Sequence, residues 1–307
     1  MKHYSVMLNE AIEGLNIKDD GVYVDATLGY AGHSREILKR IKRGHLYAFD
    51  ADSEAINYSH RTLSEISTNF KIIHSNFQFL KEKLDEENVG LVDGFLFDLG
   101  LSSPEIDDAS RGFSFMKDAV LDMRMDQSQV FQAATIVNTY KEEELLNIFY
   151  KYAEEPRSKD IVRGIVNARK NKEITHTLEL VEIIRNSVGA NYFYKKHPER
   201  EIFQALRIEV NGELKAIEVA LPEAIKRLKK GARICVITFH SLEDRLVKQI
   251  FKKYSEVPEI FKGMPDVPLE YQPLIKLINK KPITPSDREL EENSRSKSAK
   301  LRIVERI

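Results

Sequence analysis

Short apolar runs alternate with amphipathic segments over the first hundred residues. The apolar runs are rich in β-branched and aromatic side chains, as is typical of strands, and they lie at 21–25, 45–49, 70–73 and 94–97. Between them, apolar residues recur with helical spacing at 33–41 and about 53–66. Strands that alternate with helices predict βαβ units, and therefore a parallel sheet with right-handed crossovers.

The pattern changes in the middle of the chain, where strand signals nearly vanish between about Ser128 and Leu228. Apolar residues there keep helical spacing, and a strong buried strand follows at 231–239. We therefore predict an α/β domain in two parts, 1–109 and 213–307, which are separated by an inserted helical domain at 110–212.

The last hundred residues carry three further signals. Ser241 is predicted to cap the helix after the buried strand, with Asp244 three residues on in a capping-box arrangement. The stretch 261–279 contains four prolines or glycines and is predicted to be irregular. Residues 301–304 are predicted to form a final, antiparallel strand.

Composition narrows the class of protein. The chain has 307 residues, a formal net charge of −1 and 31% charged residues, which excludes a globally basic nucleic-acid binder but not a local basic face. A single cysteine, Cys235, leaves no internal disulfide and no zinc site, and it is expected to be inert core. No run is long enough to span a membrane, and the start lacks a signal-peptide core, so a cytoplasmic location is expected.

The most informative stretch is the turn Asp25–Ser34 between the first strand and the first helix. Its glycines, Gly29 and Gly32, would let the backbone approach a ligand closely, and ligands bind at this edge of open α/β sheets. Asp50 ends the second strand, where a carboxylate can accept hydrogen bonds from both ribose hydroxyls. An adenosine-containing cofactor is predicted, although a packing turn and a solvated carboxylate explain each feature separately. Thr27 stands where a dinucleotide fingerprint has its first glycine, which favours S-adenosylmethionine over NAD.

Two polar residues end later strands. Asp98 follows the fourth strand, where it would accept hydrogen bonds from an exocyclic amine and so direct the nitrogen lone pair towards a methyl donor; a turn-forming aspartate is an equally good interpretation. His240 follows the buried strand and is either a catalytic or base-contacting group or only a hydrogen-bonded strand end. Arg124, between Asp122 and Asp126, is explained by a structural ion pair.

Two basic segments suit RNA despite the neutral charge balance. Lys195, Lys196, His197 and Arg200 follow the aromatic run 192–194, and aromatic side chains interleaved with cations suit unstacked bases and phosphates. The segment 294–302 is basic, small and polar, which suits phosphate contacts. Solvated surface is the alternative explanation for each.

Taken together, seven blocks in order resemble the RsmH (MraW) family, and they cover nearly the whole chain. The blocks are Asp25–Ser34, Asp98–Ser103, Arg111–Phe115, Leu121–Asp126, Phe203–Ile208, Phe239–Arg245 and Asn293–Arg302. The resemblance implies a class I (Rossmann-like) S-adenosylmethionine-dependent methyltransferase fold with an inserted all-helical domain. It also implies methyl transfer to N4 of one cytidine in the decoding region of bacterial 16S rRNA.

The resemblance also implies site residues. Cofactor binding falls to Ala31, Gly32, His33, Asp50, Phe77, Asp98 and Glu105, with Asp50 on the ribose and Phe77 near the adenine. Asp98 and His240 are the catalytic candidates, and no metal is expected. Two positions depart from the family pattern: Ala31 replaces a frequent glycine and adds only a methyl group, and Glu105 replaces a frequent glutamine and brings a carboxylate near the cofactor.

The expected partner is small-subunit rRNA within a ribosomal particle, without a membrane, and a homodimer is left open. Two other functions remain at this point. An NAD-dependent reductase would use the same sheet, but no acid–base pair for hydride transfer is evident. A non-catalytic RNA-binding assembly factor would keep the pocket as a relic.

Overall fold

The computed structural model describes residues 5–307. The first four residues, part of the stretch expected to lack a signal-peptide core, lie outside the described residues. Its contacts divide the chain into two compact units. The first comprises Met1–Gly100 and Leu214–Ile307, and the second comprises Leu101–Glu213. The sequence-based boundaries fall after residues 109 and 212, whereas these units divide after residues 100 and 213.

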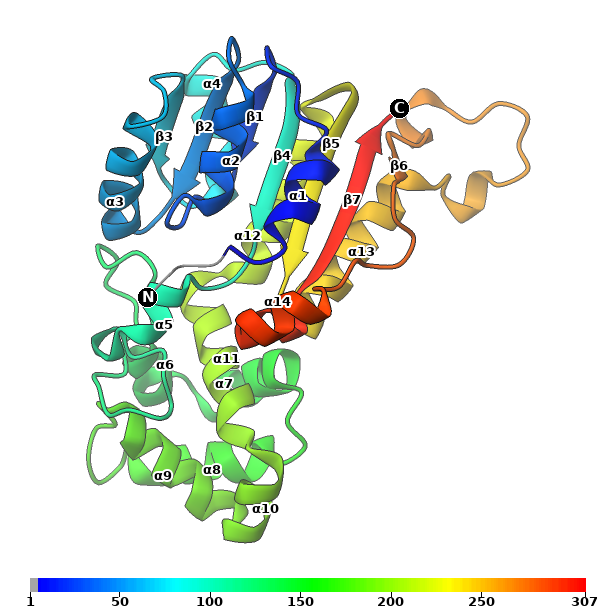
Figure 1. Ribbon diagram of the computed structural model, residues 1–307. Helices are drawn as coiled ribbons and strands as arrows, with labels where there is room; N and C mark the ends of the chain where they lie inside the picture. The colour runs from blue at the N-terminus through cyan, green and yellow to red at the C-terminus, as the bar shows by residue number, and fades with distance from the viewer. Residues whose placement is uncertain (1–4) are drawn as a thin grey trace. The chain divides into compact units, whose positions relative to one another are not determined.

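The first unit is built on a seven-stranded sheet of order β3-β2-β1-β4-β5-β7-β6 (Figure 1). Strands β1 to β5 run parallel, and β7 is antiparallel to both β5 and β6. The strands are β1 (Val22–Asp25), β2 (His45–Asp50), β3 (Phe70–His74), β4 (Val92–Asp98), β5 (Leu228–Thr238), β6 (Ile275–Leu277) and β7 (Lys300–Arg306).

The end of this sheet contains one confirmation and one correction. The predicted final antiparallel strand is confirmed as β7. The prediction that 261–279 is irregular is wrong for Ile275–Leu277, which form β6. Three residues are too few to show an alternating pattern, and β6 forms because β7 offers it an edge to pair with.

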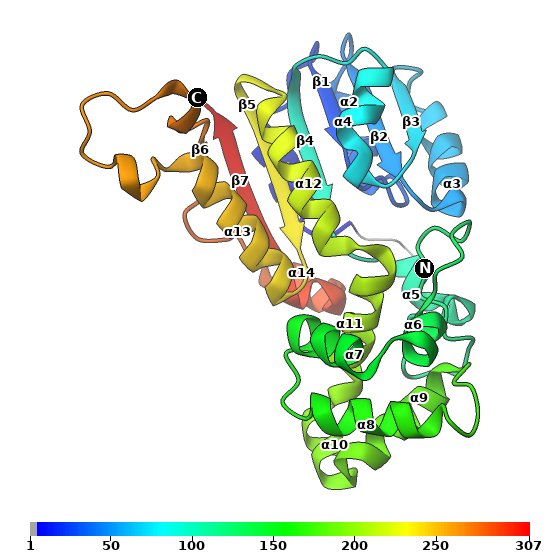
Figure 2. The ribbon, with the colours of Figure 1, turned by 180° about the vertical axis from the view of Figure 1, so that it is seen from behind.

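Helices cover both faces of the sheet, so its central strands are buried on both sides (Figures 1 and 2). In β4, Leu96 packs into one hydrophobic core, whereas Phe95 and Phe97 pack into the other. The Leu96 side is covered by α1 (Leu8–Leu15), α2 (Gly32–Arg40) and α3 (Ser53–Ser64). The opposite side is covered by α4 (Leu80–Glu86), α12 (Glu213–Lys226, of which Leu214 onward belongs to this unit) and α13 (Ser241–Ser255).

The strand register places three carboxylates at one edge of the sheet. Asp25, the last residue of β1, lies level with Ala48 of β2 and Leu96 of β4. The strands β2 and β4 flank β1, and each runs two residues further to end at Asp50 and Asp98. The parallel arrangement therefore gathers these acids beside the turn that follows β1.

The second unit is helical and has its own hydrophobic core, which includes Phe149, Ile184 and Leu206. Arg111 donates to the carbonyls of Arg124 and Met125, and Arg124 forms two hydrogen bonds of 2.7 Å with Asp122. The predicted structural ion pair of Arg124 is thus confirmed. The helices are α5 (Ser103–Asp107), α6 (Ala133–Thr139), α7 (Glu142–Ile148), a π-helical turn (Phe149–Ala153), α8 (Ser158–Ala168), α9 (Thr177–Val188), α10 (Ala190–Lys196) and α11 (Pro198–Asn211).

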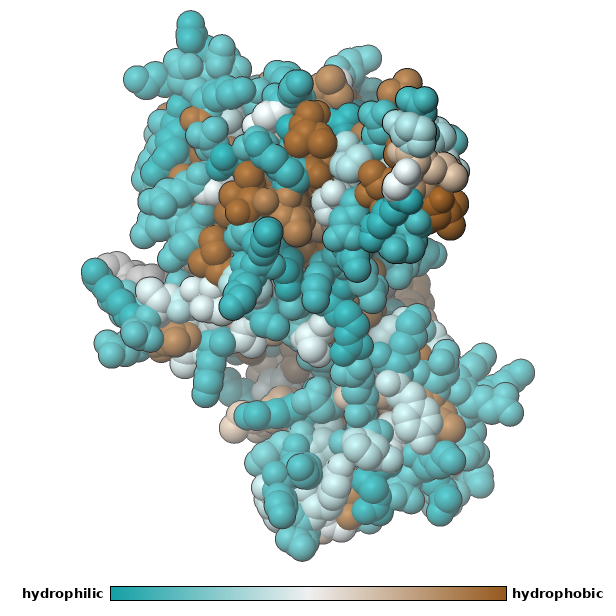
Figure 3. Space-filling view, turned by 90° about the vertical axis from the view of Figure 1, so that its right-hand side faces the viewer, coloured by the Kyte–Doolittle hydropathy of each residue, from teal (hydrophilic) through white to brown (hydrophobic). Residues whose placement is uncertain are grey.

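A surface excursion follows α13 and returns as β6, on the right of Figure 1. It exposes Ile260, Met264 and Leu269, and Figure 3, which faces this side of the first unit, shows several hydrophobic groups. After it come α14 (Asp287–Glu292) and a 3₁₀ segment (Ser294–Ser298). Among residues 5–307, no helix has the length and apolar character that a membrane span requires.

Candidate cofactor and substrate site

The turn after β1 is organised by the buried carboxylate of Asp25. Its Oδ2 accepts a 2.7 Å hydrogen bond from Ser34 Oγ, and its Oδ1 accepts one of 3.1 Å from the amide of Thr27. Thr27 Oγ1 in turn accepts from the amide of Asp98 at 2.6 Å. Burial raises the pKa of Asp25 to about 6. Sequence reasoning did not assign Asp25 a role; the signal was an aspartate at a strand end with hydroxyl residues two and nine positions later.

Two residues of this turn have left-handed backbone conformations. Gly29 has φ +48°, which glycine adopts without strain, and Ala31 has φ +61°. The Ala31 side chain is fully buried, and a left-handed conformation costs a non-glycine residue roughly 1–2 kcal/mol. The expectation that alanine adds only a methyl group here is therefore incomplete, because it also adds backbone strain.

Gly32 begins α2 and lies against the chain just before α1. A Cβ at Gly32 would lie 1.6 Å from Ser5 Oγ and 2.9 Å from Ser5 Cβ, so any larger residue would force Ser5 to move. The close approach brings the N-terminal turn of α2 next to Ser5 and Val6, and the side chain of His33 continues the same contact. The predicted glycine-rich turn thus also contacts Ser5 and Val6, just before α1.

Asp50 joins the turn to the end of β2. Its Oδ2 accepts from the amide of Gly29 at 2.7 Å, and its Oδ1 accepts from the amide of Asp52 at 2.8 Å. Each carboxylate oxygen has a second lone pair, and the side chain is only half-buried. Asp50 is therefore fixed in position and still chemically able to accept hydroxyl donors from a ribose.

Asp98 lies beside His33 at the end of β4. The distance from Asp98 Oδ2 to His33 Nδ1 is 3.4 Å, and His33 Nε2 lies 3.1 Å from the carbonyl oxygen of Val6. Asp98 Oδ1 is buried and has no hydrogen-bond partner among the described residues. Burial, and then the negative charges of Asp25, Glu243 and Glu289, raise the pKa of Asp98 well above its usual range. An unpartnered oxygen amid acidic groups suits a ligand that brings a donor and a positive charge.

The other two predicted cofactor residues lie further along the chain. Phe77 begins a 3₁₀ turn (Phe77–Phe79) just after β3, is half-buried and packs edge-on against Phe97 with ring centroids 5.8 Å apart. Glu105 belongs to the second unit, where its Oε2 accepts from the amide and hydroxyl of Ser102 at 2.8 and 2.7 Å. Glu105 therefore has a capping role at α5, which a glutamine side chain could also perform.

His240 caps α13, which corrects the predicted capping box. The predicted pair was Ser241 and Asp244, but the box is formed by His240 and Glu243, one residue earlier. His240 Nδ1 accepts from the amide of Glu243 at 3.4 Å, and His240 Nε2 lies 3.1 Å from Glu243 Oε1. Asp244 instead pairs with Lys300 and Arg302 of β7, a contact that the local sequence does not reveal. Both ring nitrogens of His240 therefore face groups of its own helix.

The two predicted basic segments differ from their sequence pattern. In α10, Lys195, Lys196 and Tyr194 are exposed, but Phe193 is buried in the core and Tyr192 donates its hydroxyl to Glu155. In the C-terminal segment, Arg295 and Lys297 are exposed, whereas Arg302 is buried against Asp244. The first segment thus keeps Lys195, Lys196 and Arg200 as exposed cations, and the C-terminal segment keeps Arg295 and Lys297. Only one of the three aromatic side chains of the first segment stays exposed.

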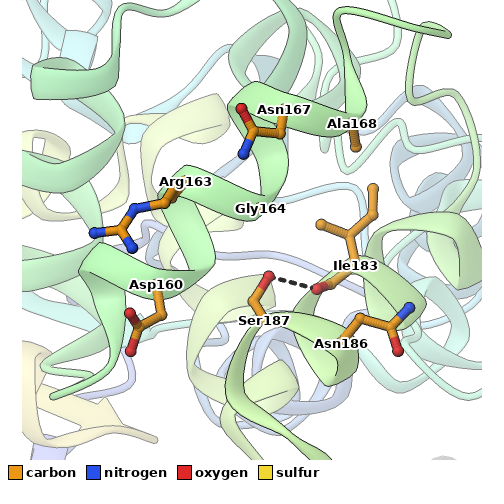
Figure 4. A pocket seen from close by; sticks show the side chains of 8 residues that line it. All are labelled: Asp160, Arg163, Gly164, Asn167, Ala168, Ile183, Asn186 and Ser187. Carbon is orange, nitrogen blue, oxygen red and sulfur yellow. Dashed lines mark hydrogen bonds between the residues drawn. The ribbon is translucent and has the colours of Figure 1, made fainter.

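The second unit also has a shallow polar pocket of about 420 Å³ between α8 and α9 (Figure 4). Gly164 allows the helices to approach, because a Cβ there would lie 1.9 Å from Ser187 Oγ. Ser187 donates to the carbonyl of Ile183, and the side chains of Arg163 and Asn167 line the opposite wall. None of the predicted site residues lines this pocket.

The strand order, with β7 antiparallel between β5 and β6, is that of the class I methyltransferase fold. A profile of the MraW methylase family matches residues 1–307. The chain therefore belongs to the MraW methylase family, and the resemblance read from the seven sequence blocks is confirmed.

Two relatives named ribosomal RNA small subunit methyltransferase H support this assignment. The protein of Exiguobacterium sibiricum is 50% identical over 307 residues, which cover 100% of this chain and 98% of the relative. That of Lactiplantibacillus plantarum is 49% identical over 310 residues, which cover 100% and 97%. A solved structure of a proposed rRNA methylase from Clostridium thermocellum aligns over 99% of both chains with a TM-score of 0.48 and 11% identity.

Proposed function

We propose that this protein transfers a methyl group from S-adenosylmethionine to N4 of a cytidine in the decoding region of bacterial 16S rRNA. The observation that carries the proposal is the meeting of the Gly29 turn, Asp50 and Asp98 at one sheet edge in a member of this methylase family. The two relatives act on small-subunit rRNA by name, and this chain spans nearly their whole length.

The residues at this edge fit the cofactor. S-adenosylmethionine supplies a methyl group that is already activated on a positively charged sulfur. Asp50 has lone pairs for the ribose hydroxyls, and Phe77 offers a half-buried ring for the adenine. The turn Ala31-Gly32-His33 is proposed to complete the cofactor site through its backbone, since both ring nitrogens of His33 already face protein groups. Glu105 is the weakest member of the set, because its carboxylate already caps α5.

Asp98 is proposed to orient the amino group of the cytidine. The lone pair of that nitrogen is delocalised into the ring, and an acceptor that holds its N–H groups directs the lone pair to the methyl carbon. About a quarter of the Asp98 side chain remains exposed, which leaves it accessible to a base flipped out of its stack. His240 is proposed to act beside it, from its position as the cap of α13.

The RNA partner is proposed to be small-subunit rRNA within a ribosomal particle. Lys195 and Lys196 of α10, and Arg295 and Lys297 near the C-terminus, are exposed cations that suit phosphate contacts. A cytoplasmic location follows from this substrate, and a homodimer is a further proposal that sedimentation would test.

The test is transfer of radiolabelled methyl groups to small subunits from a strain that lacks this gene, followed by nucleoside analysis. Label in N4-methylcytidine is expected with the wild type and is expected to be lost in Asp98→Ala. Asp266→Ala, which removes an exposed carboxylate on the surface excursion, is the matched control and should retain activity. Cofactor binding without any transfer to particles or free rRNA would overturn the proposal in favour of an assembly factor.

A further inference from the structure

The imidazole of His33 is held in one tautomer by the chain itself. Its Nε2 lies 3.1 Å from the carbonyl oxygen of Val6. A carbonyl oxygen can only accept, so Nε2 must carry a proton. In the neutral ring, Nδ1 is then an acceptor, and it faces Asp98 Oδ2 at 3.4 Å. The ring is 5% exposed, so solvent has little access to Nδ1 from the His33 side of this pair.

Asp98 needs a proton on Oδ2 when His33 Nδ1 carries none. If neither atom carried a proton, the two lone pairs would face and repel each other. With a proton on Oδ2, the Asp98 carboxyl would donate a hydrogen bond to Nδ1. The groups around Asp98 favour that proton: Asp25 on β1, Glu243 on α13 and Glu289 on α14 are all acidic, and the neutral ring of His33 on α2 offers an acceptor for it. Burial acts in the same direction.

We propose that the Asp98–His33 pair is a proton store: it holds one proton in the ligand-free protein, releases it when a cationic ligand binds beside Asp98, and takes up the proton that the substrate nitrogen loses. The last step rests on the proposed function. As the bond from nitrogen to the methyl carbon forms, the carbon–sulfur bond breaks and its electron pair stays on sulfur. One N–H bond breaks, its electron pair stays on nitrogen, and its proton passes to the Asp98 carboxylate. The positive charge of the sulfur and the negative charge of Asp98 disappear together.

His33 is a positioning residue in this scheme. Its Nδ1 accepts from the neutral carboxyl of Asp98, so it stabilises the protonated form both before ligand binding and after transfer. The Val6 carbonyl makes this possible because it keeps the Nε2 proton in place. The pair therefore returns to its starting state once the product leaves.

The first test compares S-adenosylmethionine with S-adenosylhomocysteine, which differs by one methyl group and the positive charge on sulfur. Titration calorimetry in buffers of different ionisation enthalpy counts the protons released. Below the pKa of Asp98, the affinity for the cationic ligand should rise up to about tenfold per pH unit, while that for the neutral ligand stays level. Equal proton release for both ligands would overturn the proposal, whereas failure of both ligands to bind would instead overturn the proposed function.

Two variants test the roles of the two ring nitrogens of His33 separately. His33→Asn keeps an acceptor near the Nδ1 position but loses the Val6 contact, and His33→Gln keeps the Val6 contact but loses the acceptor towards Asp98. Proton release should persist in His33→Asn and fall in His33→Gln, and it should vanish in Asp98→Asn. Equal release by the two His33 variants would contradict the assigned role of Nδ1.

A spectroscopic measurement on the wild type guards against variants that fail to fold. The ¹⁵N shifts of the His33 ring in the ligand-free protein should show the Nε2–H tautomer with a hydrogen-bonded Nδ1. Addition of S-adenosylmethionine should move the Nδ1 shift more than addition of S-adenosylhomocysteine does. An Nδ1–H tautomer would refute the proton store without bearing on the methylation itself.

Discussion

The carboxylate of Asp50 accepts the backbone amide of Gly29 at 2.7 Å, across 21 residues of sequence. This contact ties the turn after β1 to the end of β2, and Asp50 holds a second amide, that of Asp52, at 2.8 Å. The acid assigned to the ribose therefore also shapes the glycine turn that would contact the rest of the ligand. Binding and turn geometry are coupled at one side chain.

Asp50→Asn should weaken both stability and cofactor binding. Its amide nitrogen would face one of two backbone donors, so one hydrogen bond is lost whichever way the side chain turns. We expect the free energy of unfolding to fall by about 1 kcal/mol. This is the low end of the roughly 1–3 kcal/mol that an unsatisfied buried hydrogen-bonding group costs, because Asp50 is only half-buried. Cofactor affinity, measured by calorimetry, should fall at least about tenfold, which corresponds to one lost contact of roughly 1.4 kcal/mol.

Asp52→Asn is the matched control for this change. Asp52 caps α3 by accepting from the amide of Glu54 at 2.9 Å, and asparagine caps a helix about as well as aspartate. The control should therefore bind the cofactor like the wild type. A similar loss of affinity in both variants would mean that Asp50 contributes only its negative charge and no specific hydrogen bonds to the cofactor.

Gly32→Ala should destabilise the first unit, because the new Cβ would lie 1.6 Å from Ser5 Oγ. Overpacking of this kind costs about 1–3 kcal/mol, and urea unfolding would measure it. Adding Ser5→Gly should restore most of the loss, because the clash involves the Ser5 side chain. Gly90→Ala, where nothing lies within 4 Å and φ is not positive, should change stability little. A full loss that persists in the double variant would argue against a steric cause.

Much of the first unit could be predicted because its elements follow local rules. Parallel strands are buried on both faces, so the later parts of β4 (95–97) and β5 (234–237) appear as continuous apolar runs. The acids that end β2 and β4 mark strand ends directly. A parallel sheet places the carboxyl ends of its strands at one edge, so the prediction already put Asp50 and Asp98 on the same edge as the turn. Their meeting beside the turn comes from the pairing of both β2 and β4 with β1, which the structure supplies.

Three of the errors have a different origin, since each involves a partner distant in sequence. Asp244 looked like a local cap, but it pairs with Arg302, 58 residues later. The strand β6 exists only as a partner of β7. Likewise, Phe193 follows a polar surface pattern yet packs into the core of the second unit, because α10 presents it inward. No local pattern contains these long-range contacts, so sequence periodicity alone could not supply them.

Asp25 should make stability depend on pH near neutrality. Its pKa is raised from 3.8 to about 6, so its stabilising contribution is fully present below pH 3.8 and is lost as the pH rises through 6. About two pKa units correspond to roughly 3 kcal/mol. Asp25→Asn keeps a neutral side chain that can accept from Thr27 and donate to Ser34. Relative to the wild type, it should gain stability between pH 4.5 and pH 7.5, as measured by urea midpoints. Parallel curves for the two proteins would contradict the buried ionisation.

The exposed cations should control RNA affinity through counterion release. Lys195→Gln with Lys196→Gln removes two charges from the second unit, and Arg295→Gln with Lys297→Gln removes two from the first. If each cation contacts one phosphate, the slope of log affinity against log salt should fall by about 0.7–0.9 per residue replaced. Lys252→Gln with Lys262→Gln removes the same charge from exposed residues outside the two segments, so it should leave the slope unchanged. Cofactor affinity should be unaffected in all three double variants. A uniform fall in all three would assign RNA binding to net charge rather than to these segments.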